Sequence, residues 1–370
     1  MFQSDFVESE GRRVVEVIKG LDNLLHAEPN DFVISMRSFQ GGIEWCKLSG
    51  SISFHYVMLV PIKSVHPPYF AHLFKSTVYI QALRTTTDLI RDGQEIRYSN
   101  FVQVDLPLIP LDEQVAIAAF LDRETAKIDT LVSEQQRLIE LLKEKRQAVI
   151  SRAVTKGLNT CVPMKPSGIE WLGDVPEHWI VGPIKKFFKF HDGRRIPLSG
   201  EERSGCTGDF PYYGASGVID WIDRFIFNED MVLVSEDGAN LINRATPIAF
   251  VATGKYWVNN HAHIIQPPDQ NLAFWAERIE SIDLVPFITG STQPKLTAEA
   301  LSNLMIAVPP SESERVAIQK HFVALADEID ALTAEAQRGI DLMQERRTAL
   351  ISAAATGKID VRGMPKSGAA

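Results

Sequence analysis

The sequence predicts an α+β protein: two mixed α/β domains are separated by two long α-helices that pack as an antiparallel coiled coil with pseudo-twofold symmetry. A chain of 370 residues is too long for one simple core. One long amphipathic stretch recurs in it, and the segments before the two copies also match. We expect domain boundaries at residues 1–109, 110–158, 159–309 and 310–362, with a flexible tail at 363–370.

The recurring stretch begins LDEQVAIAAF at residue 111, and its copy begins SESERVAIQK at residue 311. Apolar residues repeat at spacings of three and four, which indicates a heptad seam. The predicted seam residues are Ile128, Leu131, Leu138, Leu142 and Val149 in the first copy, and Ile329, Leu332, Met343 and Leu350 in the second. Gln135 and Lys145 fall in the same seam, where they either fix its register or extend into solvent. Short connections to the domains favour antiparallel pairing.

The segments before the helices mix strands and helices. In the first, we expect strands at 32–36, 54–62 and 100–110 and a helix at 68–83. The second opens with PSGIEWLGDVPEHW and continues with many short strands and one helix at 271–282. Residues 93–110 match 293–310 at a shift of 200, but the opening stretch has no earlier counterpart. We therefore expect the first domain to be incomplete at its N-terminus.

The charge and composition limit the possible partners. A net charge of −9 argues against indiscriminate nucleic-acid binding, although residues 185–203 carry six Lys or Arg against three acidic residues. That basic stretch is either a DNA-facing surface or a solvated loop. There is no apolar run long enough for a membrane span and no apolar signal region. We expect a cytoplasmic protein with no membrane partner and with Cys46, Cys161 and Cys206 unpaired.

Three motifs that would suggest catalysis or metal binding fit those roles poorly. His66-Pro67-Pro68-Tyr69 is similar to an amino-methyltransferase motif, but histidine replaces the required acid or amide. His261 and His263 would share one face of a strand, without an evident third metal ligand. Glu236 and Asp237 precede Gly238 and fit a turn better than a nuclease site. The sequence also lacks a GxxxxGK[ST] phosphate loop, so we predict no catalytic, cofactor-binding or metal-binding residues.

Several stretches resemble the specificity subunit of type I restriction-modification enzymes: SGIEWLGDVPEHW, PLDEQVAIAAFLDRE, GASGVIDWIDRFIFNEDMVLVSEDGAN and KYWVNNHAHII. The resemblance covers nearly the whole chain from Asp31 onward. It implies two target-recognition domains that each read half of a bipartite site in double-stranded DNA, with the helices setting the gap. It also implies host defence, with two modification (methyltransferase) subunits and the restriction (motor and nuclease) subunits as partners. S-adenosylmethionine, ATP and Mg²⁺ would belong to those partners, and this chain would be a non-catalytic subunit.

Loop side chains that can read base edges or hold phosphates are the candidate DNA contacts. In the second domain these are Lys185, Lys186, Arg194, Arg195, Asn240, Asn243, Asn259, Asn260, His261, Thr292, Gln293 and Lys295; in the first they are Arg37, Gln40, Arg91, Gln94 and Arg97. Asn260 and Gln293 would equally suit a role in satisfying buried backbone groups. The alternative function is a coiled-coil scaffold or interaction protein without sequence-specific DNA contact.

Overall fold

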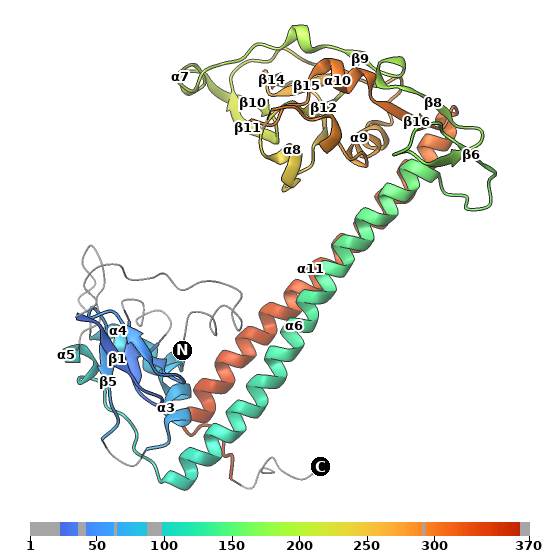
Figure 1. Ribbon diagram of the computed structural model, residues 1–370. Helices are drawn as coiled ribbons and strands as arrows, with labels where there is room; N and C mark the ends of the chain where they lie inside the picture. The colour runs from blue at the N-terminus through green and yellow to red at the C-terminus, as the bar shows by residue number, and fades with distance from the viewer. Residues whose placement is uncertain (1–22, 36–41, 63–64, 87–97, 291–292, 363–370) are drawn as a thin grey trace. The chain divides into compact units, whose positions relative to one another are not determined.

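The computed structural model describes residues 23–35, 42–62, 65–86, 98–290 and 293–362 (Figure 1). The chain divides into two compact units, which are described separately: unit 1 comprises residues 1–139 and 335–370, and unit 2 comprises residues 140–334. Each unit therefore contains part of both long helices, α6 (Leu111–Lys156) and α11 (Glu312–Ala355). None of the helices in the described ranges is long and apolar enough to cross a membrane.

Unit 1 contains short strands and helices before α6. These are β1 (Leu25–Ala27), β2 (Phe32–Ile34), β3 (Glu44–Trp45), β4 (Gly50–Ile52), β5 (Val57–Leu59), α3 (Pro67–Phe74), α4 (Thr77–Thr85) and α5 (Tyr98–Phe101). The strands form a β3-β2-β5 sheet and a β1-β4 pair, all antiparallel. The core joins Phe32 and Phe74 to Leu121 of α6 and Ala354 of α11. The Tyr69 hydroxyl donates to the Ala355 carbonyl oxygen at 3.0 Å and so ties α3 to α11.

Two local predictions for unit 1 are wrong. The helix expected at 68–83 is broken into α3 and α4, because the Ser76 side chain accepts a hydrogen bond from the Tyr79 amide and caps a new helix. Val78 is consequently 47% exposed. The strand expected at 100–110 is also absent: α5 ends at Phe101, and residues 105–110 are irregular.

Unit 2 contains most of the strands. Its first elements after α6 are β6 (Met164–Pro166), β7 (Asp174–Pro176), β8 (Ile180–Pro183), η2 (Ile184–Lys186), β9 (Lys189–Phe190), η3 (Asp192–Arg194), α7 (Gly200–Ser204), β10 (Thr207–Gly214) and β11 (Gly217–Ile222). They are followed by β12 (Met231–Ser235), α8 (Asn240–Asn243), β13 (Ala249–Ala252), β14 (Trp257–Val258), β15 (Ala262–Gln266), α9 (Leu272–Glu280), η4 (Val285–Phe287), α10 (Ala298–Asn303) and β16 (Met305–Val308).

The main sheet of unit 2 has the order β13-β12-β15-β9, and its neighbouring strands are antiparallel. Strand β12 is buried at every residue because it lies between two partners. Smaller sheets join β11-β10-β14 and β16-β8. Helix α9 packs on this sheet through Trp275 and Ile279, which share a core with Ile150 of α6 and Ile318 of α11.

The two long helices pack antiparallel within each unit. In unit 1, Arg347 pairs with Asp129 at 2.8 Å, while Ile139 packs with Ala336 and Ile340, so numbers rise along one helix as they fall along the other. In unit 2, the C-terminal part of α6 shares a core with the N-terminal part of α11. Both helices are followed by a glycine, Gly157 or Gly357, whose φ of +76° suits a helix stop.

The inner face of the pair differs from the predicted seam at every second position. Ile128 and Ile329 are buried, and Leu142, Val149, Met343 and Leu350 are half-buried. Leu131, Leu138 and Leu332 are instead 48%, 42% and 45% exposed. Val132 and Ile139 take the inner positions of α6, one residue further along. The spacing is therefore four then three from Ile128, whereas we predicted three then four.

The internal repeat is also a repeat of contacts. Ile117 and Leu121 of α6 lie in the core of unit 1, and their repeat partners Ile318 and Phe322 of α11 lie in the core of unit 2. At the other helix end, Ile150 and Ile351 are likewise each buried in one core. Matching positions of the two helices thus contribute apolar side chains to the hydrophobic cores of the two units.

Candidate functional site

A cluster of charged side chains lies where three segments of unit 2 meet. Strand β12 leads to Glu236, β15 carries His263, and Asp192 follows β9 at the start of η3. The antiparallel register places Val234 opposite His263, which brings the ends of these strands together. Segments 27 to 71 residues apart in sequence therefore converge, which the sequence alone did not reveal.

His263 is the most deeply buried side chain of this cluster and contacts two of its neighbours. The ring is 1% exposed; its Nδ1 lies 2.6 Å from Asp192 Oδ2, and its Nε2 lies 2.8 Å from the Leu296 carbonyl oxygen. Both partners are hydrogen-bond acceptors, so both bonds form only when both ring nitrogens carry hydrogen. The ring therefore lies between the Asp192 carboxylate and the Leu296 carbonyl oxygen and links them.

Two basic side chains flank the Glu236 carboxylate. Arg195 donates to one of its oxygens, and the Lys295 ammonium lies 3.1 Å from the other. Arg195 also donates to the Ala262 carbonyl oxygen at 2.9 Å. Asp237 pairs with His261 at 2.8 Å, and Asp192 pairs with His263 at 2.6 Å. Arg195 is thus engaged by a carboxylate and a backbone carbonyl oxygen, so it shapes the loops rather than supplying free positive charge.

Hydrogen bonds keep two of these carboxylates ionised despite their burial. Burial raises the pKa of Asp192, but the hydrogen bond and charge of His263, the Ile264 amide and the charge of Arg195 together hold the pKa below its ordinary value. Burial likewise raises the pKa of Glu236, but the hydrogen bonds from Arg195 and Lys295 and the charges of His263 and Arg195 together hold it below its ordinary value. Both groups therefore stabilise the fold in their charged form.

Unit 2 should lose stability in acid because of these two groups. Their ordinary pKa values are 3.8 for Asp192 and 4.5 for Glu236, and the folded values are lower, so their contribution is complete above pH 4.5. It is lost as the pH falls below these ordinary values and through the lower folded values of the two groups. We expect thermal melts of the full chain to show a steep acid decline that Asp192→Asn makes shallower. Asp209→Asn, at an exposed position of β10, is the control, and equal acid profiles for both variants would contradict the assignment.

Four of the predicted DNA contacts come together at this cluster. They are Arg195, Asn260, His261 and Lys295; Asn260 contributes its carbonyl oxygen at 3.5 Å from Arg195 and is exposed. Arg194 lies nearby in sequence but pairs with Glu229 at 3.1 Å and stacks over the Phe227 ring at 4.4 Å. Both arginines are therefore paired with carboxylates, and their role as DNA contacts stays a prediction.

The remaining candidates of unit 2 serve several roles. Asn240 and Asn243 close the turn after α8 through bonds to Thr246 and Ala245. Asn259 is 4% exposed, and its side chain accepts from the His261 amide at 2.8 Å. Gln293 is exposed. The structure therefore places these asparagines in local scaffolding and leaves Gln293 at the surface.

Lys185 and Lys186 lie in η2 and differ from the arginines in their surroundings. The Lys185 ammonium donates to Asn303 Oδ1 at 2.7 Å, and the Lys186 ammonium lies 6.0 Å from the Phe187 ring centre. Across the described ranges, no ion pair engages either lysine. These side chains therefore keep a positive charge that an anionic partner can use.

Six predicted contacts lie outside the described residues: Arg37, Gln40, Arg91, Gln94, Arg97 and Thr292. All five candidates of the first domain are among them. They stay predictions.

The motifs that fitted catalysis poorly have structural roles. Pro67 begins α3, and Tyr69 is fully buried with its hydroxyl bonded to α11. Gly238 adopts a φ of +99°, as the predicted turn requires. Among the described residues, no three His, Cys, Asp or Glu side chains are grouped so that they can hold a metal ion.

Comparison with known proteins identifies the domain that carries the cluster. Residues 176–340 match the family described as the type I restriction modification DNA specificity domain. A putative type I restriction enzyme specificity subunit of Haemophilus influenzae is 30% identical over 155 residues, which is 41% of this chain and 38% of that protein. The StySPI specificity subunit of Salmonella potsdam is 31% identical over 152 residues, which is 39% of this chain and 32% of that protein. The matches thus span about a third of each relative's length.

The fold comparison extends over more of the chain. One solved structure, from work on complex assembly and conformational transition of the type I R-M system, covers 90% of this chain and 83% of its own, with a TM-score of 0.61 at 16% identity. At that identity the likeness concerns the fold, which contains both domain segments and both long helices. Residues 176–340 therefore match the family of the type I restriction modification DNA specificity domain, and over about two fifths of its length the chain is similar to type I restriction enzyme specificity subunits.

Proposed function

We propose that this chain is the DNA-recognition subunit of a type I restriction-modification complex and that it reads a bipartite site in double-stranded DNA. The observation that carries the proposal is the specificity domain at residues 176–340, joined to a repeated long helix that follows each domain segment. In this assignment each domain segment reads one half of the site, and the helices set the distance between the halves.

The proposal makes the chain a non-catalytic subunit. Two modification subunits would bind S-adenosylmethionine and transfer the methyl group, and the restriction subunits would use ATP and Mg²⁺. The charged cluster supports this division, because its carboxylates and His263 are engaged with one another and with backbone groups. A general acid or base must instead reach a substrate proton.

The exposed face of the helix pair is the proposed dock for the modification subunits. In unit 1, Leu131 and Leu138 lie seven residues apart on α6 and are 48% and 42% exposed, and Leu342 of α11 is 65% exposed. Residues seven apart lie on the same side of a helix. Large apolar side chains in such a row fit a protein partner better than solvent.

For DNA, the proposal assigns the phosphate contacts of unit 2 to Lys185 and Lys186. Both lack an ion-pair partner in the described part of the chain, whereas Arg194 and Arg195 are neutralised. Base reading falls to the exposed polar side chains around the charged cluster, Asn260, His261 and Gln293. The cluster fixes the loops on which they lie.

Replacing both lysines should weaken DNA binding by the whole chain in a salt-dependent way. Each phosphate contact contributes about 0.9 to the slope of log affinity against log salt, so Lys185→Ala with Lys186→Ala should lower the slope by about 2. Fluorescence anisotropy with a duplex at several salt concentrations measures it. Lys143→Ala with Lys145→Ala, on the exposed surface of α6, is the matched control. A scaffold without DNA contact would show no saturable binding by any of these proteins.

A further inference from the structure

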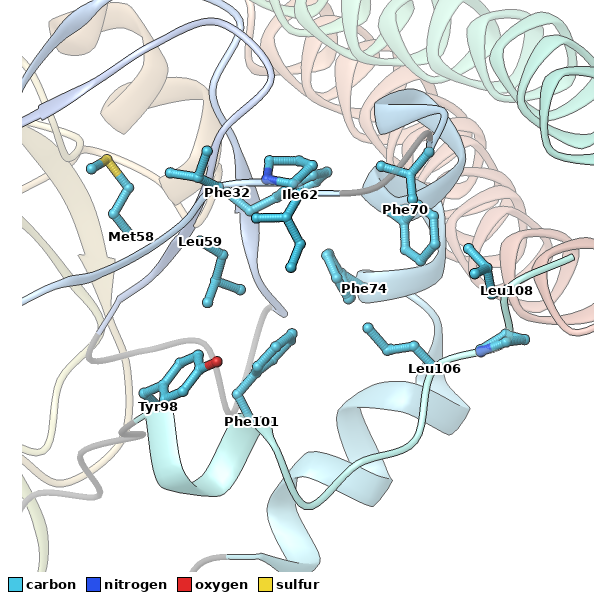
Figure 2. A pocket seen from close by; sticks show the side chains of 14 residues that line it. Phe32, Met58, Leu59, Ile62, Phe70, Phe74, Tyr98, Phe101, Leu106 and Leu108 are labelled. Carbon is cyan, nitrogen blue, oxygen red and sulfur yellow. The ribbon is translucent and has the colours of Figure 1, made fainter. Parts of the chain in front are cut away.

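An apolar pocket of about 670 Å³ lies on unit 1 beside β5 (Figure 2). Its walls come from β5, α3, α5 and residues 106–108. Figure 2 shows Phe70, Phe74, Phe101 and Leu106 around the space, with no polar side chain among these four. Two apolar residues of the wall, Ile62 and Leu108, are 93% and 58% exposed. Exposed apolar surface of this kind marks a place where another element packs.

The internal repeat locates the same place in unit 2. Residues 306–308 correspond to residues 106–108 at the shift of 200, and the sequence PYFAHLF of α3 corresponds to AFWAERI of α9. That alignment places Trp275 on Phe70. Each of these rings meets the preceding aromatic ring edge-on at 5.2 Å, which supports the match in space.

In unit 2 the corresponding place is filled by the chain's own residues 180–191. Strand β8 pairs with β16, and β9 pairs with β15. Between them, the Ile184 amide donates to the Leu304 carbonyl oxygen at 2.9 Å. Ile184 and Phe188 are 0% and 4% exposed, and the Phe188 ring contacts Trp275 at 5.0 Å. This strand-turn-strand segment thus adds a strand to each of two sheets and contributes two buried apolar side chains, Ile184 and Phe188.

The covered and uncovered places differ sharply in burial. Ile306, Ala307 and Val308 are at most 2% exposed under β8. Leu108, the counterpart of Val308, is 58% exposed. Within the ranges that the structure describes, no strand pairs with residues 105–108 or with the outer edge of β5. Unit 1 therefore presents two backbone edges and an apolar pocket where unit 2 has a bound segment.

We propose that this pocket binds an extended apolar segment of a second polypeptide, with the pattern of residues 180–190, IVGPIKKFFKF. One end of the segment would pair with residues 105–108, the other would extend the sheet at β5, and two large apolar side chains would enter the pocket. Strand addition to an open edge takes its affinity from backbone bonds and its specificity from such pockets. Residues 180–191 of a second copy are not the source, because they are already paired and buried in unit 2.

The test uses a fluorescent peptide of residues 178–191 and the full chain without DNA. The peptide should bind saturably, and Leu108→Glu in the chain should weaken binding at least about tenfold by placing a carboxylate in the apolar pocket. Leu48→Glu is the matched control, because Leu48 is 57% exposed in the same unit but does not line the pocket. A peptide carrying Ile184→Asp and Phe188→Asp should not bind.

Hydrogen exchange then locates the bound peptide. Protection of backbone amides at residues 57–60 and 105–108 supports the proposal. Protection confined to β15 and β16 would mean that the peptide has displaced residues 180–191 of unit 2, and would overturn it. If the peptide does not bind the full chain, the proposal is also overturned. If the peptide binds only after residues 1–22 are deleted, a second polypeptide is rejected as the occupant of the pocket. DNA binding is measured separately, so failure here leaves the proposed function untouched.

Discussion

Replacing Asp269 with alanine is expected to destabilise unit 2 by about 3–5 kcal/mol, the usual cost of leaving a buried charge without its partner. The Arg315 guanidinium at the start of α11 lies 2.7 Å from Asp269, and these side chains are 11% and 7% exposed. The same carboxylate accepts hydrogen bonds from the Trp275 indole and from Asn271, each at 2.9 Å. Alanine would remove all of these acceptors and leave the buried Arg315 guanidinium without a carboxylate, with the Pro309 carbonyl oxygen at 2.7 Å and the Trp275 ring centre at 5.4 Å.

Denaturant unfolding of the full chain measures this loss. Asp327→Ala, at an exposed position of the same helix, is the control and should change the free energy of unfolding by less than about 0.5 kcal/mol. Asp269→Asn keeps an acceptor oxygen and should fall between the two. If Asp269→Ala unfolds like Asp327→Ala, the pair does not anchor the domain to the helix.

In unit 1, the start of α6 is joined to the preceding domain segment without a charge pair. Gln114, the repeat partner of Arg315, is 1% exposed; it accepts from the His66 amide and donates to the Ile109 carbonyl oxygen, each at 2.8 Å. Both residues thus join the start of a long helix to the preceding chain and to the start of α3 or α9. The ionic version carries the larger penalty when one partner is removed.

Lengthening both helices by one heptad is expected to change the spacing of the recognised half-sites and not their sequences. A heptad adds about 10 Å of helix, which corresponds to about 3 base pairs at 3.4 Å each. Insertions after Ile139 and after Ala336, which pack together, keep the inner face continuous. Sequencing of DNA selected by the wild-type and lengthened complexes measures the gap.

A heptad inserted in only one helix is the control. It leaves the two inner faces unequal in length, so the free energy of unfolding should fall and selection should weaken. Altered half-sequences with an unchanged gap in the doubly lengthened protein would refute the role of the helices as a spacer.

The long helices are well predicted because the signal that specifies them is local and occurs twice. We expected a helical region at 110–158, and α6 spans Leu111–Lys156; α11 ends at Ala355, before the expected 362, where Gly357 stops it. The inner face was predicted less well. Leu131 and Val132 are adjacent, as are Leu138 and Ile139, so apolar spacing alone does not decide which of each pair turns inward. Packing against the other helix decides it.

The site was predictable in composition but not in connectivity. The basic stretch at 185–203 contains Arg195, and the motif NNHAH contains His261 and His263. Nothing local indicates that Glu236 reaches Arg195 across 41 residues or that Asp192 reaches His263 across 71. These contacts follow from the pairing of β9, β12 and β15. They engage Arg195 with the Glu236 carboxylate, which the basic composition of the stretch did not indicate.

Selection of DNA from a random duplex library by the full chain, assembled with a modification subunit, tests the central claim most directly. The account predicts enrichment of two short half-sequences separated by a fixed number of unspecified base pairs, with contact to the second half weakened by the Lys185→Ala and Lys186→Ala changes. Recovery of unenriched DNA, or of one uninterrupted sequence, would contradict it.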